Sequence, residues 1–95
     1  MYNPRNRQEI AYEYTLHIKR RQIQQHAELE EIALTVEEGS LIGVRDNKGS
    51  RRRVFREGYT QDGQNYADKE LTIVYTFEKG SVVIITMVTR YGQFE

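Results

Sequence analysis

The chain of 95 residues contains no cysteine. Disulfides, thiol nucleophiles and thiolate metal sites are therefore excluded together. No apolar run reaches the roughly 20 residues that span a bilayer, and the first ten residues, MYNPRNRQEI, lack the apolar centre of a signal peptide. We therefore expect a cytoplasmic protein that has no membrane association.

The common catalytic motifs are also missing. The chain has only two histidines, His17 and His26, and their nine-residue separation does not suggest a zinc site. No glycine-rich loop opens a helix after a strand, and no G-x-S-x-G elbow is present. We therefore expect neither a metal nor an organic cofactor.

A formal net charge of zero hides an uneven distribution of charge. Residues 27–38 carry five glutamates and no basic residue, whereas residues 45–56 carry six basic residues against the single Asp46. The two segments can attract each other within the fold, or one of them can face an outside partner. A neutral total argues against indiscriminate coating of nucleic acid but leaves room for a local phosphate-binding patch.

The first half of the chain has helical signals. Leu29, Ile32, Ala33 and Val36 recur at helical spacing, and Gly39 predicts a left-handed stop. Before that segment, Thr15 predicts the cap of a helix that runs through His17 and Arg21. Asn3-Pro4 could begin an earlier helix, but the alternation in residues 9–14 favours a short edge strand instead.

The second half has strand signals. Residues 41–57 read as two strands joined by a turn near residues 47–49, and the segment EGYTQDGQNYAD, residues 57–68, reads as an exposed loop. The segment 69–77 alternates, with Tyr75 and Phe77 expected in the core, and VVIITMVTR is apolar on nearly every residue, as in a central or covered strand. We predict one α+β domain over residues 1–95, with residues 1–8 flexible. Two short N-terminal helices pack on an antiparallel sheet of four or five strands.

Arginine, tyrosine and histidine side chains are the remaining candidates for chemistry. His17 and Arg21, four residues apart, share one helix face, and metal-free RNA cleavage needs such an acid or base beside a cation. The catalytic candidates are His17, Arg21, Arg53, Tyr75 and Tyr91. The substrate-binding candidates are Arg51, Arg52, Thr86 and Arg90.

Each of these residues also has a purely structural interpretation. His17 can be a helix histidine that hydrogen-bonds to the backbone. The run RRRVFR can be a solvated strand face that protects an edge. Tyr75 can fill the core beneath the helices, Tyr91 can anchor the chain end, and His26 can lie on the surface between the two helices.

The order Y-x-Y-T-x-H-x-x-x-R, the amphipathic segment ending in EEG, and the later RRRVF and KELTIVYTFEKGSVVIITMVTRYGQF resemble a family of small bacterial domains of unknown function. That family is similar in outline to the BrnT-type and RelE-type toxins of toxin–antitoxin systems. The resemblance implies a first strand, two helices and then an antiparallel sheet. It matches His17 and Arg21 to the family's H-x-x-x-R positions, Arg53 or Arg52 to its basic strand residue, and Thr86 to its threonine.

Three hypotheses follow from the residues and the resemblance. The first is a toxin-like, metal-independent ribonuclease that acts on RNA and is covered by a cognate antitoxin or another protein. In it His17 is the acid or base, Arg21 and Arg53 hold the phosphate, and Tyr75 or Tyr91 positions the nucleotide. The second is a non-catalytic module for protein interaction or homodimerisation. The third is an RNA binder that does not cleave.

Overall fold

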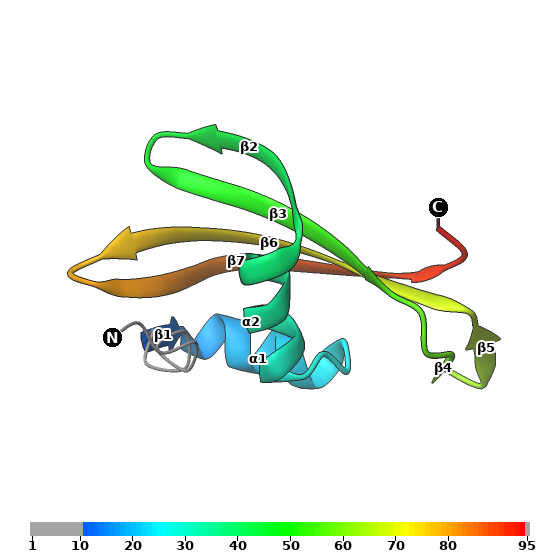
Figure 1. Ribbon diagram of the computed structural model, residues 1–95. Coiled ribbons are helices and arrows are strands. Elements are labelled where there is room, and N and C mark those ends of the chain that lie inside the picture. The colour runs from blue at the N-terminus through cyan, green and yellow to red at the C-terminus, as the bar shows by residue number, and fades with distance from the viewer. Residues whose placement is uncertain (1–10, 95) are drawn as a thin grey trace, which may run out of the picture.

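Two helices and seven strands form over residues 11–94, the part of the chain that this computed structural model describes (Figure 1). In chain order they are β1 (Ala11–Tyr14), α1 (Leu16–Gln24), α2 (Leu29–Glu38), β2 (Ser40–Arg45), β3 (Lys48–Phe55), β4 (Tyr59–Gln61), β5 (Gln64–Tyr66), β6 (Asp68–Glu78) and β7 (Ser81–Gly92). The predicted α+β class is confirmed. The expectations for Asn3-Pro4, for residues 1–8 and for the first two residues of the strand 9–14 lie outside the described residues.

Short-range contacts explain where the helices begin and end. The hydroxyl of Thr15 accepts a hydrogen bond from the backbone N–H of Ile18 at 3.1 Å, which confirms the predicted cap. At Gly39 the predicted left-handed stop is wrong, since its φ is −71°. Glycine is required there for space, because a Cβ would lie 2.4 Å from the carbonyl oxygen of Thr35 and 2.8 Å from that of Arg52.

Three two-residue turns join neighbouring strands into hairpins. They are Asp46–Asn47, Asp62–Gly63 and Lys79–Gly80, and all six residues have positive φ, as type I′ turns require. The prediction of an exposed loop at residues 57–68 is wrong, because β4 and β5 form a small separate hairpin there. The Asp-Gly pair in this segment is a hairpin signal that the loop prediction overlooked.

The main sheet has five strands in the order β1-β7-β6-β3-β2. Three of its pairings are antiparallel, and β1 pairs with β7 in parallel, so the sheet is mixed rather than wholly antiparallel. The apolar β7 lies between β1 and β6, as predicted for a central strand. Two β-bulges interrupt the register of this sheet. Ile85 of β7 has no paired residue on β6, and Ile42 of β2 has no paired residue on β3, so each is an extra residue in its strand.

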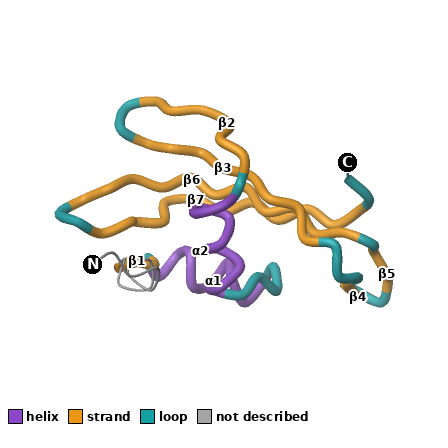
Figure 2. The backbone as a smooth tube through the Cα atoms, in the orientation of Figure 1, coloured by secondary structure: helices purple, strands orange, loops and turns teal. Residues whose placement is uncertain are grey.

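Both helices pack on one face of the sheet, which we call the helix-covered face (Figures 1 and 2). α1 packs on β7 and β1, and α2 packs on β3 and β6. The core between the layers includes Ile18, Ile32, Leu71, Ile73 and Ile84, all with no exposed surface. Tyr75 is buried as predicted, whereas Phe77 is 69% exposed, so its assignment to the core is wrong.

No element of the described chain covers the opposite face, which we call the uncovered face. It carries alternate residues of the strands: Ser50, Arg52 and Val54 on β3, Glu70, Thr72 and Val74 on β6, and Thr86, Val88 and Arg90 on β7.

Candidate nucleic-acid interface

The three consecutive arginines of β3 divide between the two faces of the sheet. Arg51 and Arg53 pair in register with Ile73 and Leu71, whose side chains lie in the core beneath the helices. Arg52 pairs with Thr72 and points to the uncovered face, because successive strand residues alternate. The arginine side chains therefore divide between the two faces, although Arg52 and Arg53 both line one hollow of about 360 Å³ at the edge of β3.

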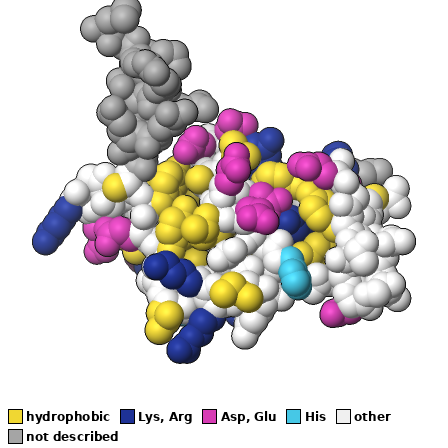
Figure 3. Space-filling view, turned by 90° about the horizontal axis from the view of Figure 1, so that it is seen from below, with side chains coloured by type: hydrophobic (Ala, Val, Ile, Leu, Met, Phe, Trp, Pro, Cys, Tyr) yellow, Lys and Arg dark blue, Asp and Glu magenta, His cyan; other side chains and the backbone are white. Residues whose placement is uncertain are grey.

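On the helix-covered face, the arginines bind partners within the protein. Arg51 donates to the hydroxyl of Tyr75 at 3.0 Å and to the carbonyl of Gly39 at 2.9 Å. Arg53 forms an ion pair with Glu38 at 2.8 Å and stacks over the ring of Phe55. Acidic side chains gather on this side of the molecule (Figure 3). Glu38 of the acidic helix α2 therefore neutralises Arg53, as the opposite charge of the two segments allows, whereas Arg51 binds two uncharged oxygen acceptors.

On the uncovered face, a buried carboxylate lies between two arginines. Glu70 accepts a hydrogen bond from Nε of Arg90 at 2.8 Å, and its other oxygen lies 3.8 Å from Nε of Arg52. Arg52 also donates to the hydroxyl of Thr72 at 3.4 Å. Glu70 therefore orients the guanidinium of Arg90 on β7 and lies near that of Arg52 on β3.

A second buried carboxylate, Asp68, extends this arrangement. It lies 2.8 Å from Arg56 and also accepts the backbone N–H of Phe94 at 2.8 Å. The carbonyl of Phe94 accepts from Arg56 at 2.6 Å, and its ring lies 4.8 Å from the guanidinium of Arg90. An open hollow of about 510 Å³ lies beside Arg56, Asp68 and Phe94. Phe94 thus connects the two carboxylate sites. We use the name arginine cluster for the three arginines and the two carboxylates of these sites: Arg52, Arg56, Arg90, Glu70 and Asp68.

The arginine cluster has one positive charge in excess, and its cations face solvent. The side chains of Arg52, Arg56 and Arg90 are 48%, 54% and 59% exposed, whereas those of Glu70 and Asp68 are 7% and 4% exposed. A guanidinium has five N–H donors, and each of the three uses only some of them on described residues. The remaining donors can bind an anion, and hydrogen bonds to the carboxylates hold two of the three guanidinium groups, those of Arg56 and Arg90, in place beforehand.

The predicted catalytic residues lie on the helix-covered face or on α1. His17 is exposed on α1, where no hydrogen bond joins it to a described residue, and Arg21 donates to the carbonyl of Met87 on β7 at 3.1 Å. Arg53 lies on β3, two strands from β7, which corresponds to about 10 Å of sheet. The structure therefore separates Arg53 from the pair His17 and Arg21.

The two catalytic tyrosine candidates have structural contacts. Tyr75 is buried and accepts the hydrogen bond from Arg51. The hydroxyl of Tyr91 donates to the carbonyl of Gln25 at the end of α1, at 2.6 Å. This contact fits the anchoring role that was the alternative for Tyr91.

The predicted substrate-binding residues divide in the same way as the arginines of β3. Arg52, Thr86 and Arg90 belong to the uncovered face, and Arg51 belongs to the helix-covered face. Sequence reasoning missed Glu70, Asp68, Arg56 and Phe94 as members of the site. The available signal was the alternation of Asp68 with Glu70 in one strand, which places both carboxylates on one face.

A separate polar cluster is buried beneath α2. Lys69 is 2% exposed and forms an ion pair with Glu31 at 2.6 Å. Its ammonium also donates to the carbonyl of His26 at 3.2 Å and lies 4.7 Å from the ring centre of Tyr59. Burial, and then the negative charge of nearby Glu31, raise the pKa of Tyr59 to about 12. This cluster joins the sheet to the start of α2.

The comparisons with known proteins add no family to this description: no protein-family model, curated protein or solved structure matches the chain. Within residues 11–94, no group of three or more histidine or acidic residues could hold a metal ion. In the same part of the chain, neither helix is long and apolar enough to cross a bilayer.

Proposed function

We propose that this protein binds single-stranded RNA on the uncovered face of its sheet, through phosphate contacts from Arg52, Arg56 and Arg90. The observation that carries the proposal is that three half-exposed guanidinium groups lie beside two buried carboxylates on one open face, two of them hydrogen-bonded to the carboxylates at 2.8 Å. Guanidinium groups bind phosphate through paired N–H donors, and prior orientation lowers the entropy that binding costs.

The shape of the surface favours a single strand. An open sheet face can accept an extended strand along its surface, and RNA-binding domains commonly use sheets for this purpose. Phe94 and the guanidinium of Arg90 together offer a flat surface on which a base can stack. The neighbouring Thr72 and Thr86 add hydroxyl groups that can bond to phosphate or to a 2′-hydroxyl.

Binding without cleavage is the version of the hypothesis that the arrangement favours. A general acid or base must reach the reacting atoms within hydrogen-bond distance. His17 belongs to the layer of helices, whereas the arginine cluster is on the other side of the sheet. We therefore assign RNA contact to the cluster and no catalytic step to His17.

The decisive experiment compares two neighbouring arginines. Arg52→Gln and Arg53→Gln remove the same charge from adjacent positions, one from the uncovered face and one from the helix-covered face. Fluorescence anisotropy with a labelled single-stranded RNA should show affinity reduced about fivefold by Arg52→Gln, or about 1 kcal/mol. Arg53→Gln should bind as the unchanged protein does.

Two results would refute the proposal: no binding by the unchanged protein at low salt, or equal losses in both variants. Gel analysis of the same RNA in excess EDTA tests the ribonuclease hypothesis at the same time. Cleavage that disappears in His17→Ala would return catalysis to α1.

A further inference from the structure

The outer edge of β2 has no neighbouring strand in the described part of the chain. β2 is the last strand of the sheet, and all six of its residues are exposed. Leu41, Ile42 and Val44 are 54%, 47% and 71% exposed, although such side chains are usually buried. An exposed apolar edge strand is a template for pairing with another strand.

The extra residue in β2 gives its side chains a symmetric arrangement. Ser40 pairs with Arg52, and Gly43 and Arg45 pair with Ser50 and Lys48, so these three positions belong to the uncovered face. Leu41 and Val44 pair with Arg51 and Gly49 and belong to the helix-covered face.

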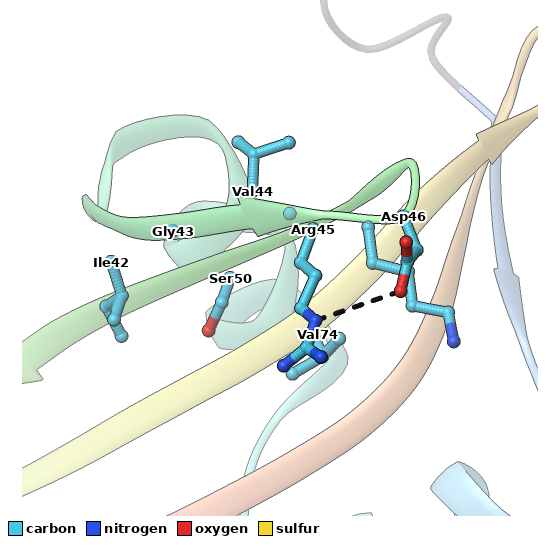
Figure 4. A pocket seen from close by; sticks show the side chains of 9 residues that line it. Ile42, Gly43, Val44, Arg45, Asp46, Ser50 and Val74 are labelled. Atoms are coloured by element: carbon cyan, nitrogen blue, oxygen red, sulfur yellow. Dashed lines mark ion pairs between the residues drawn. The ribbon is translucent and has the colours of Figure 1, made fainter.

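Ile42 completes this arrangement. It lines a hollow of about 360 Å³ on the uncovered face together with Ser50 and Val74, while Val44 points the opposite way (Figure 4). From residue 40 to residue 45 the faces therefore run uncovered, covered, uncovered, uncovered, covered, uncovered. This order reads the same in both directions.

We propose that β2 pairs antiparallel with β2 of a second copy of this chain, about a two-fold axis between Ile42 and Gly43. Directly opposite residues of an antiparallel pair lie on the same face. About this axis Leu41 is opposite the partner's Val44, and Ser40 is opposite the partner's Arg45, and in both pairs the faces agree. A regular strand would place residues 41 and 44 on opposite faces, so the extra residue makes this register possible.

Charge and composition point to a second copy as the occupant. The chain has no net charge, so no overall charge repulsion opposes the pairing of two copies. The two Leu41–Val44 pairs form the apolar part of the contact, and each Arg45 meets the small polar Ser40. A contact in which the same patch meets itself is the usual arrangement of a two-fold dimer.

The dimer joins the two sheets into one continuous sheet with both uncovered faces on the same side. The two arginine clusters then lie on a single surface, and their Arg52 residues are roughly 20 Å apart from strand spacing and rise. The pairing itself does not depend on RNA binding. Its test is made without RNA, so that failure of one proposal is separate from failure of the other.

The test uses two equally exposed apolar residues. Val44 on β2 and Ile23 on α1 are each 71% exposed. Sedimentation equilibrium of the full chain over a wide concentration range should show a dimer for the unchanged protein and for Ile23→Lys, and a monomer for Val44→Lys. Circular dichroism should be the same for all three.

A double variant tests the register. Leu41→Glu with Val44→Lys places opposite charges across the two-fold axis and should restore the dimer that Val44→Lys loses. A chain that remains monomeric at every concentration overturns the proposal, as does a dimer unaffected by Val44→Lys. A double variant that remains monomeric overturns the pairing of Leu41 with Val44.

Discussion

Arg52 and Arg53 are adjacent in the chain, yet they form ion pairs on opposite faces of the sheet. Arg52 lies 3.8 Å from Glu70 on the uncovered face, and Arg53 lies 2.8 Å from Glu38 at the end of α2. The first belongs to a cluster with an excess positive charge, and the second is neutralised by the acidic helix. In the proposed function, Arg52 contributes to binding an anion and Arg53 contributes to the stability of the fold.

The salt dependence of RNA binding should differ between these two positions. Each neutralised phosphate of a single strand contributes about 0.7 to the slope of log affinity against log salt concentration. Arg52→Gln should reduce that slope by about 0.7, and Arg53→Gln should leave it unchanged. Anisotropy titrations at several salt concentrations measure both slopes. A flat slope for the unchanged protein would remove phosphate contact as the basis of binding.

Gly39→Ala should destabilise the protein although the backbone there is ordinary. The added methyl would meet the carbonyl oxygens of Thr35 and Arg52 at 2.4 and 2.8 Å, and both belong to the backbone. Relief requires α2 and β3 to move apart, which should cost about 1–3 kcal/mol in urea unfolding. Gly43→Ala is the matched control, because nothing in the same chain lies within 4 Å of its added methyl, and both variants are compared at concentrations below those that favour a dimer. Equal stabilities of the two variants would contradict the close contact at Gly39.

Glu31→Ala should strongly lower the free energy of unfolding, because Glu31 is the partner of a buried lysine. It leaves the buried Lys69 ammonium without its carboxylate and removes the acceptor for the backbone N–H of Glu28. Breaking one side of a buried ion pair costs about 3 kcal/mol in the free energy of unfolding. Glu30→Ala, an exposed carboxylate one residue earlier, should cost about 0.5 kcal/mol or less. Chemical unfolding measures the loss of stability in both variants. Similar losses would contradict a stabilising role for the ion pair between Lys69 and Glu31.

Stability should fall at high pH because of Tyr59. Its pKa is about 12 in the folded protein, against an ordinary value of 10.0. Since the unfolded chain loses this proton first, the free energy of unfolding should be unaffected by Tyr59 below pH 10 and should decrease as pH rises toward 12. Tyr59→Phe should reduce that dependence.

Tyr59→Phe should also leave stability at neutral pH unchanged or slightly higher. The Tyr59 hydroxyl is buried without a hydrogen-bond partner in the described residues, so removing it removes a desolvated polar group. Unfolding curves at neutral and alkaline pH measure both effects. An unchanged pH dependence in Tyr59→Phe would assign the alkaline loss to other tyrosines.

Features that depend on near neighbours in the chain could be predicted from the sequence. The cap at Thr15, the helix that begins beside Glu28 and the alternation of β6 each involve residues two to four apart. The hairpin at Asp62–Gly63 belongs to the same class, because its turn residues alone indicate it. These features follow from backbone preferences and hydrophobic period, which do not need the rest of the fold.

Only the tertiary structure decided which side chains share a face. The register of β3 on β6 placed Arg52 beside Glu70 and Arg53 beneath α2, and a shift of one residue would have exchanged them. The parallel pairing of β1 with β7 and the extra residue at Ile42 were likewise set by strands distant in the sequence. Composition and local pattern determined the elements of this protein. The pairing of distant strands determined its arginine cluster. Successive side chains of a strand point to opposite faces, so the register of two strands sets which of their side chains lie together.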